Sequence, residues 1–212
     1  MAPRGRRRDA RQPVAAHDVL GDATRPSLAF PPENQTTAFE NSWLDHRASK
    51  DLVRVYMDTA EDVAARAVSE RMAVLLPCDP LVVGEAECGR GFIETFLPRA
   101  FRRPLAPDER AAFLALFEDA HAQHGFSEAV SLVVQAALQS PQFLYRLEPV
   151  PDDAVPGDVL PVTGYEMAAR LSYFLTASMP DDELWSAAAD GGLATAAEVE
   201  AQARRRSEEH TS

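Results

Sequence analysis

The sequence predicts an all-α protein, a helical bundle of about six to eight short helices in two lobes with no substantial sheet. Apolar residues recur at three- and four-residue steps along most of the chain. Ser and Thr residues stand where helix caps are needed, and no segment alternates apolar and polar residues for long enough to demand a strand. With 212 residues, 46% of them hydrophobic, the chain is long enough to bury a substantial core.

The first expected helix begins at Ser49, a suitable N-cap, and runs to about Leu76. Its apolar positions lie on one side of a helix, namely Leu52, Val55, Tyr56, Ala60, Val63, Ala64, Ala67, Met72 and Leu75. Prolines at 77 and 80 end it. A second helix is expected over roughly residues 86–97, and Pro98 should stop or kink it because proline lacks a backbone N–H.

Two further helices are expected in the middle of the chain. Pro107, followed by two acidic residues, suits the first turn of a third helix, which Gly125 closes. Ser127 begins a fourth helix, which Ser140-Pro141 interrupts. Residues 142–148 then read as a short helical continuation or a buried turn.

The last third begins with a linker at 149–161, rich in proline and aspartate, which we expect to be a surface loop between the two lobes. Thr163 with Glu166, and Thr195 with Glu198, have the spacing of capping boxes and predict helices to Leu175 and near the end of the chain. A short helix with acidic residues at its start is expected between them, over residues 181–189.

Composition excludes several classes of function. The chain has 33 acidic and 21 basic residues, a formal net charge of −12, which argues against a nucleic-acid partner and against anionic lipid. It has no run of 18 apolar residues, so no transmembrane segment is expected. It also lacks hydrolase, zinc-protease, P-loop, dinucleotide and haem-attachment motifs. We therefore expect no catalytic, cofactor-binding or metal-binding residues here, which leans against an enzyme.

The two ends differ from the rest of the chain. Residues 1–16 are basic and lack the apolar stretch of a signal peptide, so an unstructured or spurious start is expected. Residues 206–212 form a polar string that breaks the last helix pattern and matches a translated sequencing adapter, so we expect them to lie outside the fold.

Cysteine and histidine suggest few sites. Cys78 and Cys88 are ten positions apart. Their spacing is compatible with a disulfide, with two free thiols or, least favoured of the three, with a metal or redox site. His121 and His124 have a spacing compatible with one metal ion, but no third ligand is marked and a solvated helix face explains them better. The sequence gives no catalytic neighbour to the other three histidines, at 17, 46 and 210.

Arginine is the residue type that most strongly suggests a binding site in this sequence. Arg99, Arg102 and Arg103 cluster before Pro104 and could clamp an anion, although structural ion pairs with carboxylates such as Glu148 or Glu166 are the commoner outcome. Arg170 lies four residues after Glu166, which favours a pair on one helix.

Six short sequence segments, which occur in a fixed order, identify a family more specifically than any single motif above. They are residues 17–22 (HDVLGD), 30–33 (FPPE) with 39–41 (FEN), 99–105 (RAFRRPL), 140–148 (SPQFLYRLE), 170–175 (RLSYFL) and 178–184 (SMPDDEL). Together they resemble a bacterial family of large exported proteins built from domains of unknown function 1587, 1595 and 1592.

The resemblance implies a domain order, with the end of the first domain and a long helix at 17–91, the second domain at 92–125 and a truncated third domain at 126–205. It also implies an internal fragment of a longer protein. Members are typically exported, periplasmic or at the cell surface, which supports a Cys78–Cys88 disulfide, and they often carry a c-type haem domain elsewhere in the chain. The expected partner is the rest of the full-length chain, and no cofactor is expected in this part.

The leading hypothesis is a non-catalytic helical scaffold or interaction module of an exported multidomain protein. The alternative is part of an enzyme or electron-transfer assembly, related to polysaccharide or associated with a cytochrome. Its site would use Arg99, Arg102 and Arg103 with carboxylates from among Glu148, Glu166, Asp181 and Asp182. The two hypotheses differ in where these arginines and carboxylates lie. The enzyme hypothesis expects them to line one cleft, and the scaffold hypothesis expects them to pair with one another in a core.

Overall fold

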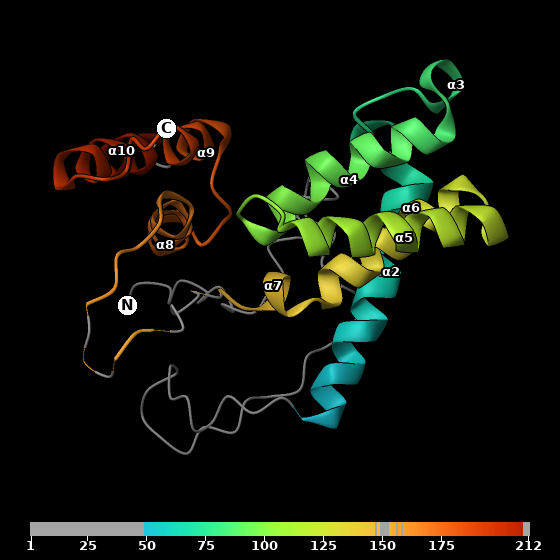
Figure 1. The fold of residues 1–212 in the computed structure, drawn as a ribbon, viewed down its shortest axis with the longest axis horizontal. Helices are drawn as coiled ribbons and strands as arrows, with labels where there is room; N and C mark the ends of the chain where they lie inside the picture. The colour runs from blue at the N-terminus through green and yellow to red at the C-terminus, as the bar shows by residue number, and fades with distance from the viewer. Residues whose placement is uncertain (1–48, 147, 149–152, 156, 158, 210–212) are drawn as a thin grey trace, which may run out of the picture. The chain divides into compact units, whose positions relative to one another are not determined.

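The structure, a computed structural model, describes residues 49–146, 148, 153–155, 157 and 159–209, with side chains to residue 207. Within these ranges the chain forms nine helices and no strand, which confirms the all-α prediction (Figure 1). The predictions made for residues 1–48, with their two histidines, and for His210 lie outside the described residues. None of the described helices is long and apolar enough to cross a membrane.

The described residues form two compact units, each made of two stretches of chain. Unit 1 comprises residues 97–106 and 141–209, and unit 2 comprises residues 49–96 and 107–140. The linker at 149–161 therefore lies within unit 1, and its expected place between two lobes is wrong. The reason is that hydrogen bonds from Arg102 join the first stretch of unit 1 to residues 142–145 of the second.

Unit 2 is a helical bundle around α6. Its helices are α2 (Lys50–Leu75), α3 (Pro80–Val83), the first part of α4 (Glu85–Phe101), α5 (Pro107–His124) and α6 (Phe126–Gln139). Helix α6 packs against both α2 and α5, because apolar residues cover most of its surface. The fully buried side chains of this unit are almost all apolar, and include Val63, Phe92, Ile93, Phe117, Val130, Val133 and Val134.

A glycine allows close packing within unit 2. A Cβ atom at Gly89 would lie 2.0 Å from the Cζ atom of Phe117, so only glycine lets the Phe117 ring lie against this part of α4. The Phe117 side chain is buried as a result.

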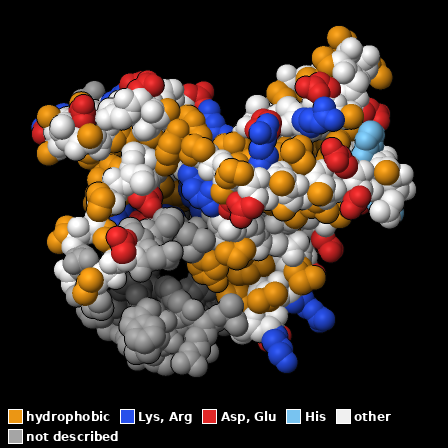
Figure 2. Space-filling model, viewed as in Figure 1, with side chains coloured by type: hydrophobic (Ala, Val, Ile, Leu, Met, Phe, Trp, Pro, Cys, Tyr) orange, Lys and Arg blue, Asp and Glu red, His pale blue; other side chains and the backbone are white. Residues whose placement is uncertain are grey.

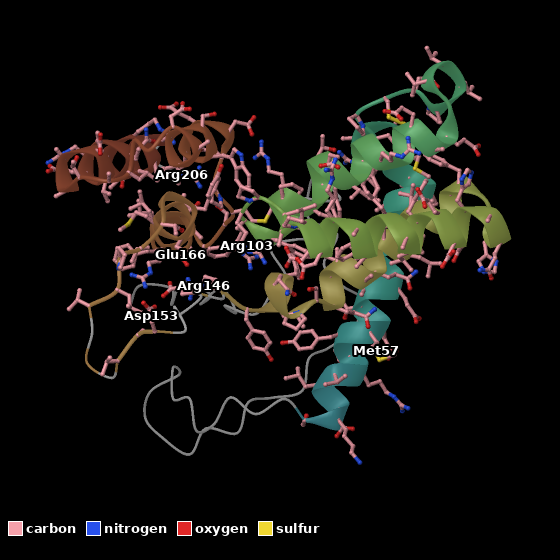
Figure 3. The ribbon with its side chains drawn as sticks, in the orientation of Figure 1. Met57, Arg103, Arg146, Asp153, Glu166 and Arg206 are labelled. Atoms are coloured by element: carbon pink, nitrogen blue, oxygen red, sulfur yellow. A yellow bond between two sulfur atoms is a disulfide. The ribbon has the colours of Figure 1, made fainter. Side chains whose placement is uncertain are left out.

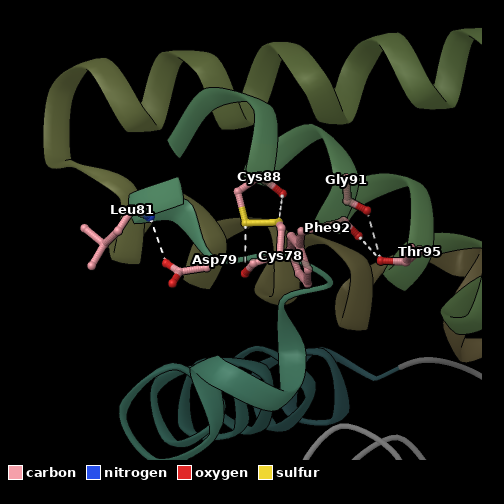
Figure 4. The surroundings of a disulfide bond; sticks show 7 residues. All are labelled: Cys78, Asp79, Leu81, Cys88, Gly91, Phe92 and Thr95. Carbon is pink, nitrogen blue, oxygen red and sulfur yellow. Dashed lines mark hydrogen bonds between the residues drawn. A yellow bond between two sulfur atoms is a disulfide. The ribbon is translucent and has the colours of Figure 1, made fainter. Parts of the chain in front are cut away.

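A disulfide closes the turn between α2 and α4 (Figure 4). Cys78 and Cys88 are bonded, with their Cα atoms 5.7 Å apart, as the predicted disulfide requires. The loop that they enclose contains α3, whose N-cap Asp79 accepts a hydrogen bond of 2.9 Å from the Leu81 N–H. Side chains at the end of α3 are exposed and apolar, and Leu81 is 93% exposed (Figure 2).

Helix α4 does not stop at Pro98 but continues to Phe101, past its expected end at about residue 97; of the two predicted outcomes, a stop or a kink, the stop is wrong. Proline removes one backbone hydrogen bond, yet the helix is closed by two others, from Arg102 N–H to the Arg99 carbonyl and from Arg103 N–H to the Pro98 carbonyl, each 3.1 Å. Arg102 has φ +59°, the left-handed conformation that such a C-terminal motif needs. The proline is thus tolerated inside the last turns.

Unit 1 contains α7 (Pro141–Leu144), α8 (Gly164–Thr176), α9 (Asp182–Ala189) and α10 (Ala196–Glu209). Its small apolar core consists of Ala168, Leu184, Ala188 and Leu193, with further side chains packed around them. A Cβ atom at Gly164 would lie 2.7 Å from the Ala188 carbonyl oxygen, so glycine permits α8 to approach α9 closely. The Thr163–Glu166 capping box is present as predicted.

Helix α10 continues to Glu209, so the expectation that the chain leaves the fold at Arg206 is wrong. Arg206 is 8% exposed. Its guanidinium donates hydrogen bonds to Asp181 Oδ2 and Ser172 Oγ, each 2.8 Å, and to Thr176 Oγ1 at 3.0 Å. These acceptors stabilise a buried charge that the sequence pattern alone marks as surface.

Candidate functional site

The most distinctive feature of unit 1 is a cavity of about 300 Å³ with four arginines in its wall. It is lined by Phe101, Arg102, Arg103, Pro104, Gln142, Arg146, Glu148, Thr163, Tyr165, Glu166, Ala169 and Arg170. These residues come from the end of α4, from the segment around α7 and from the first turns of α8. Figure 3 shows Arg103, Arg146 and Glu166 near the start of α8.

Arg102 forms the buried part of the wall and is 6% exposed. Its guanidinium donates to the carbonyl oxygens of Gln142 at 2.6 Å, Tyr145 at 2.8 Å and Phe143 at 3.2 Å. Those carbonyls lie at the C-terminal end of α7, where helix carbonyls lack partners within the helix. Arg102 therefore caps α7 and fixes the segment that carries Arg146.

Arg102 makes no ion pair with a carboxylate among the described residues, unlike the pairing expected from the sequence. Burial is the main cause that lowers the pKa of Arg102, and the neighbouring Tyr173 opposes this shift. Arginine nevertheless stays protonated in proteins. The buried end of the cavity is thus positive, with its charge shared among backbone carbonyls.

Arg170 and Glu148 form a two-pronged ion pair at the cavity wall. The Arg170 Nε atom donates to Glu148 Oε1 at 2.6 Å, and a second bond joins Nη2 to Oε2. The hydrogen bond from Arg170 lowers the pKa of Glu148, to which the charge of Arg146 also contributes. Glu148 is therefore an ionised acceptor that is already occupied.

Glu166 is occupied as well. Its Oε2 atom accepts a hydrogen bond of 2.7 Å from the Thr163 N–H, which is the capping-box contact at the start of α8. Its charge also raises the pKa of Arg170, after the larger effect of Glu148. Both carboxylates of the cavity thus have structural partners, and the pKa of Glu148 is lowered, whereas a general acid needs a raised pKa.

Arg146 and Arg103 complete the positive wall. The Arg103 guanidinium donates to the Pro104 carbonyl at 3.0 Å. Arg146 lies over the Tyr173 ring, 5.3 Å from its centre. Among the described residues, Arg146 makes neither a hydrogen bond nor an ion pair, although it lies near two other charged side chains of the cavity. Its donors are available to a ligand.

Three other residues of the expected arginine–carboxylate site lie elsewhere in unit 1. Arg99 pairs with Asp182 and lies over the Trp185 ring, 5.5 Å from its centre. Asp181 caps α9 and accepts hydrogen bonds from Arg205 at 2.9 Å and Arg206 at 2.8 Å. None of these residues lines the cavity.

No group of three potential metal ligands is found in the described part of the chain, around the histidine pair or elsewhere. The His121 Nε2 atom lies 2.8 Å from Glu85 Oε2, and its ring stacks on Phe117 at 5.5 Å.

The sequence brought five lining residues into consideration, namely Arg102, Arg103, Glu148, Glu166 and Arg170. It missed Arg146 and Tyr165. The one signal for Arg146 in the sequence was its position two residues before Glu148. The available charge of Arg146 suits the cavity to hold an anionic group by charge-assisted hydrogen bonds.

Three family models match successive parts of the chain. Residues 14–69 match PSD3, a protein of unknown function (DUF1587). Residues 88–148 match PSD5, a protein of unknown function (DUF1595), and residues 162–211 match PSD4, a protein of unknown function (DUF1592). The predicted resemblance to these three is confirmed. No curated protein and no solved structure gives a significant match. The domain limits expected at 91, 125 and 205 stay a prediction.

Proposed function

Because this chain carries segments of three families of unknown function in succession, we propose that it is a non-catalytic binding module of an exported multidomain protein, with an anionic ligand in the cavity of unit 1. The observation that carries this proposal is the availability of Arg146 in a wall that already holds three other arginines. The formal charge of the lining is positive, although the whole chain is acidic.

Export is supported by the disulfide, which persists in oxidising compartments. The expected partner stays the rest of a longer chain, and haem c, if present, would belong to another part of it. These features are part of the proposal and rest on the resemblance together with the disulfide.

The enzyme alternative has one observation in its favour, because four of its expected residues do line one cavity. Binding is the better supported of the two. Glu148 is paired with Arg170, Glu166 is used in a helix cap, and a nucleophile paired with a base is absent from the described lining. With its carboxylates engaged in this way, the wall is better suited to hold an anion than to transfer a proton.

Acetate is a suitable probe for this proposal, because it presents one carboxylate and little else. Titration followed by amide chemical shifts should perturb residues around the cavity, such as Tyr165 and Ala169. The uncharged analogue acetamide should give no comparable change. Arg146→Gln should weaken acetate binding about tenfold, which is the usual effect of losing one charge-assisted hydrogen bond.

Arg54→Gln is the matched control, since Arg54 is an exposed arginine of α2 in unit 2. It should leave acetate binding unchanged. Equal binding by the wild type and Arg146→Gln, or acetate shifts spread over both units, would remove the support for the cavity as the site.

A further inference from the structure

A second depression adjoins the cavity and shares part of its wall. It has a volume of about 840 Å³ and is lined by Arg146, Glu148, Met167, Arg170, Leu171, Tyr173 and Phe174. Three of these residues, Arg146, Glu148 and Arg170, also line the cavity. The charged side chains therefore stand between a small cavity and a wider groove along α8.

The groove side of this boundary is apolar. Met167, Leu171 and Phe174 are four and three positions apart on α8, so they lie along one face of the helix. The first two also pack against the core of unit 1, which holds their side chains in place. Phe174 is 85% exposed, an unusual position for a large aromatic side chain.

We propose that the cavity and this groove together bind a small amphipathic monocarboxylate, such as a short fatty acid, with its carboxylate on Arg146 and its hydrocarbon tail along α8 to Phe174. This inference rests on the proposed function and specifies the ligand. The planar guanidinium of Arg146 matches a carboxylate, and the groove offers hydrocarbon surface in reach of it.

The charges favour a monoanion over a dianion. Two carboxylates, Glu148 and Glu166, remain in the cavity wall, and a phosphate dianion would lie close to both. Among the described residues of the groove, Tyr173 carries the one hydroxyl group and no side chain carries an amide, whereas a sugar acid would need several such partners for its own hydroxyls. A single charge with an apolar tail fits both surfaces.

A series of straight-chain carboxylates tests this inference. Affinities of acetate, butanoate, hexanoate and octanoate would be measured by titration calorimetry or by amide chemical shifts. Hexanol serves as the control that has a tail but no charge, and inorganic phosphate as the control dianion. Each buried methylene should raise affinity by about threefold to fourfold until the groove is filled. Hexanol and phosphate should both bind more weakly than hexanoate.

Two variants separate the head from the tail. Phe174→Ser should leave acetate binding unchanged and reduce the gain per methylene. Arg146→Gln should weaken every member of the series by a similar factor. Leu81→Ser, which changes an exposed apolar residue in unit 2, is the matched control for Phe174→Ser and should alter neither quantity.

The failures of the two proposals are distinguishable. If acetate binds at the cavity but affinity does not rise with chain length, the ligand class is wrong and the anion site stands. If phosphate binds more tightly than hexanoate, the ligand class is also wrong. If acetate fails to bind, or longer chains bind equally well to Arg146→Gln, the proposed function fails together with the inference.

Discussion

Units 1 and 2 bury different kinds of side chain. The interior of unit 2 is almost wholly apolar, built from α6 against α2 and α5, with one disulfide at its edge. Unit 1 has a smaller apolar core and contains both buried arginines of the described residues, Arg102 and Arg206. One chain thus fixes its helices in two ways. Unit 1 relies on hydrogen bonds from buried charges, and unit 2 relies on close apolar packing and a disulfide.

The largest expected effect tests the dependence of unit 1 on Arg102. Arg102→Ala should lower the free energy of unfolding by about 3–5 kcal/mol, because three backbone carbonyls at the end of α7 lose their donor and each unsatisfied buried acceptor costs about 1–3 kcal/mol. Arg102→Gly should be less harmful by about 1 kcal/mol, because glycine accepts the positive φ without strain. Urea unfolding would give both values.

Hydrogen exchange by mass spectrometry would place the loss of Arg102 within the chain. Peptides from residues 141–176 should exchange faster, while those from α6 should change little. A variant whose faster exchange is confined to α6 would contradict the assignment of Arg102 to unit 1.

The disulfide tests unit 2. Replacing both Cys78 and Cys88 by serine should cost about 3 kcal/mol, as expected for cross-linking a loop of this length. Thermal unfolding of the wild type in reductant should then resemble that of the double variant in its absence. Unchanged stability on reduction would show that apolar packing alone holds α3 and α4.

Acid should affect unit 1 through Asp181. Burial tends to raise its pKa, but hydrogen bonds from Arg205 and the Leu184 N–H and the charge of Arg206 prevail and lower it from 3.8 to about 2. A lowered folded-state pKa stabilises the protein above about pH 3.8, and that contribution is lost as the pH falls towards 2. The loss should amount to about 2 kcal/mol.

Asp181→Asn keeps a good helix cap but removes this charge. The stability of unit 1 in the variant should therefore depend less on pH between 3.8 and about 2. Unfolding would be followed by the fluorescence of α9 and α10 labels placed at exposed positions. An identical pH profile for the variant and the wild type would assign the acid sensitivity to other carboxylates.

Helix caps should give the smallest effect and a similar one in both units. Thr163→Ala in unit 1 and Ser49→Ala in unit 2 should each cost about 1 kcal/mol, since each cap accepts one backbone N–H at 3.3 and 3.1 Å respectively. Chemical denaturation would measure both. A much larger loss for Thr163→Ala would indicate that the cap also positions the cavity residues.

Local sequence signals predicted most of the helices, because caps, prolines and apolar spacing act over a few residues. The boxes at Thr163 and Thr195 and the first turn at Pro107 are examples. The expected helix end at about residue 97 was too early, because backbone hydrogen bonds beyond Pro98 close α4 at Phe101. The pattern also failed at Arg206, whose acceptors lie on α8 and at the N-cap of α9 and are distant in sequence.

The cavity could be predicted only in part. The cluster at 99–103 pointed to an arginine-rich surface, but only long-range contacts decide that Arg102 and Arg103 face the cavity while Arg99 pairs with Asp182. Arg146 gained its place because Arg102 holds the carbonyls around it. Spacing along the sequence cannot predict this arrangement, because Arg102 positions Arg146 through hydrogen bonds to the backbone of a distant segment.

The interleaved order of the two units has a consequence for folding during synthesis. Residues 97–106 leave the ribosome before residues 107–140, but they belong with residues 141–209, which follow. Unit 2 can complete its helices first, while the Arg102 segment waits for α7 to emerge. Helices α5 and α6 lie between the two stretches of unit 1 in the sequence. If they fold first, residues 106 and 141 are brought closer together, and the loop that unit 1 must close becomes shorter.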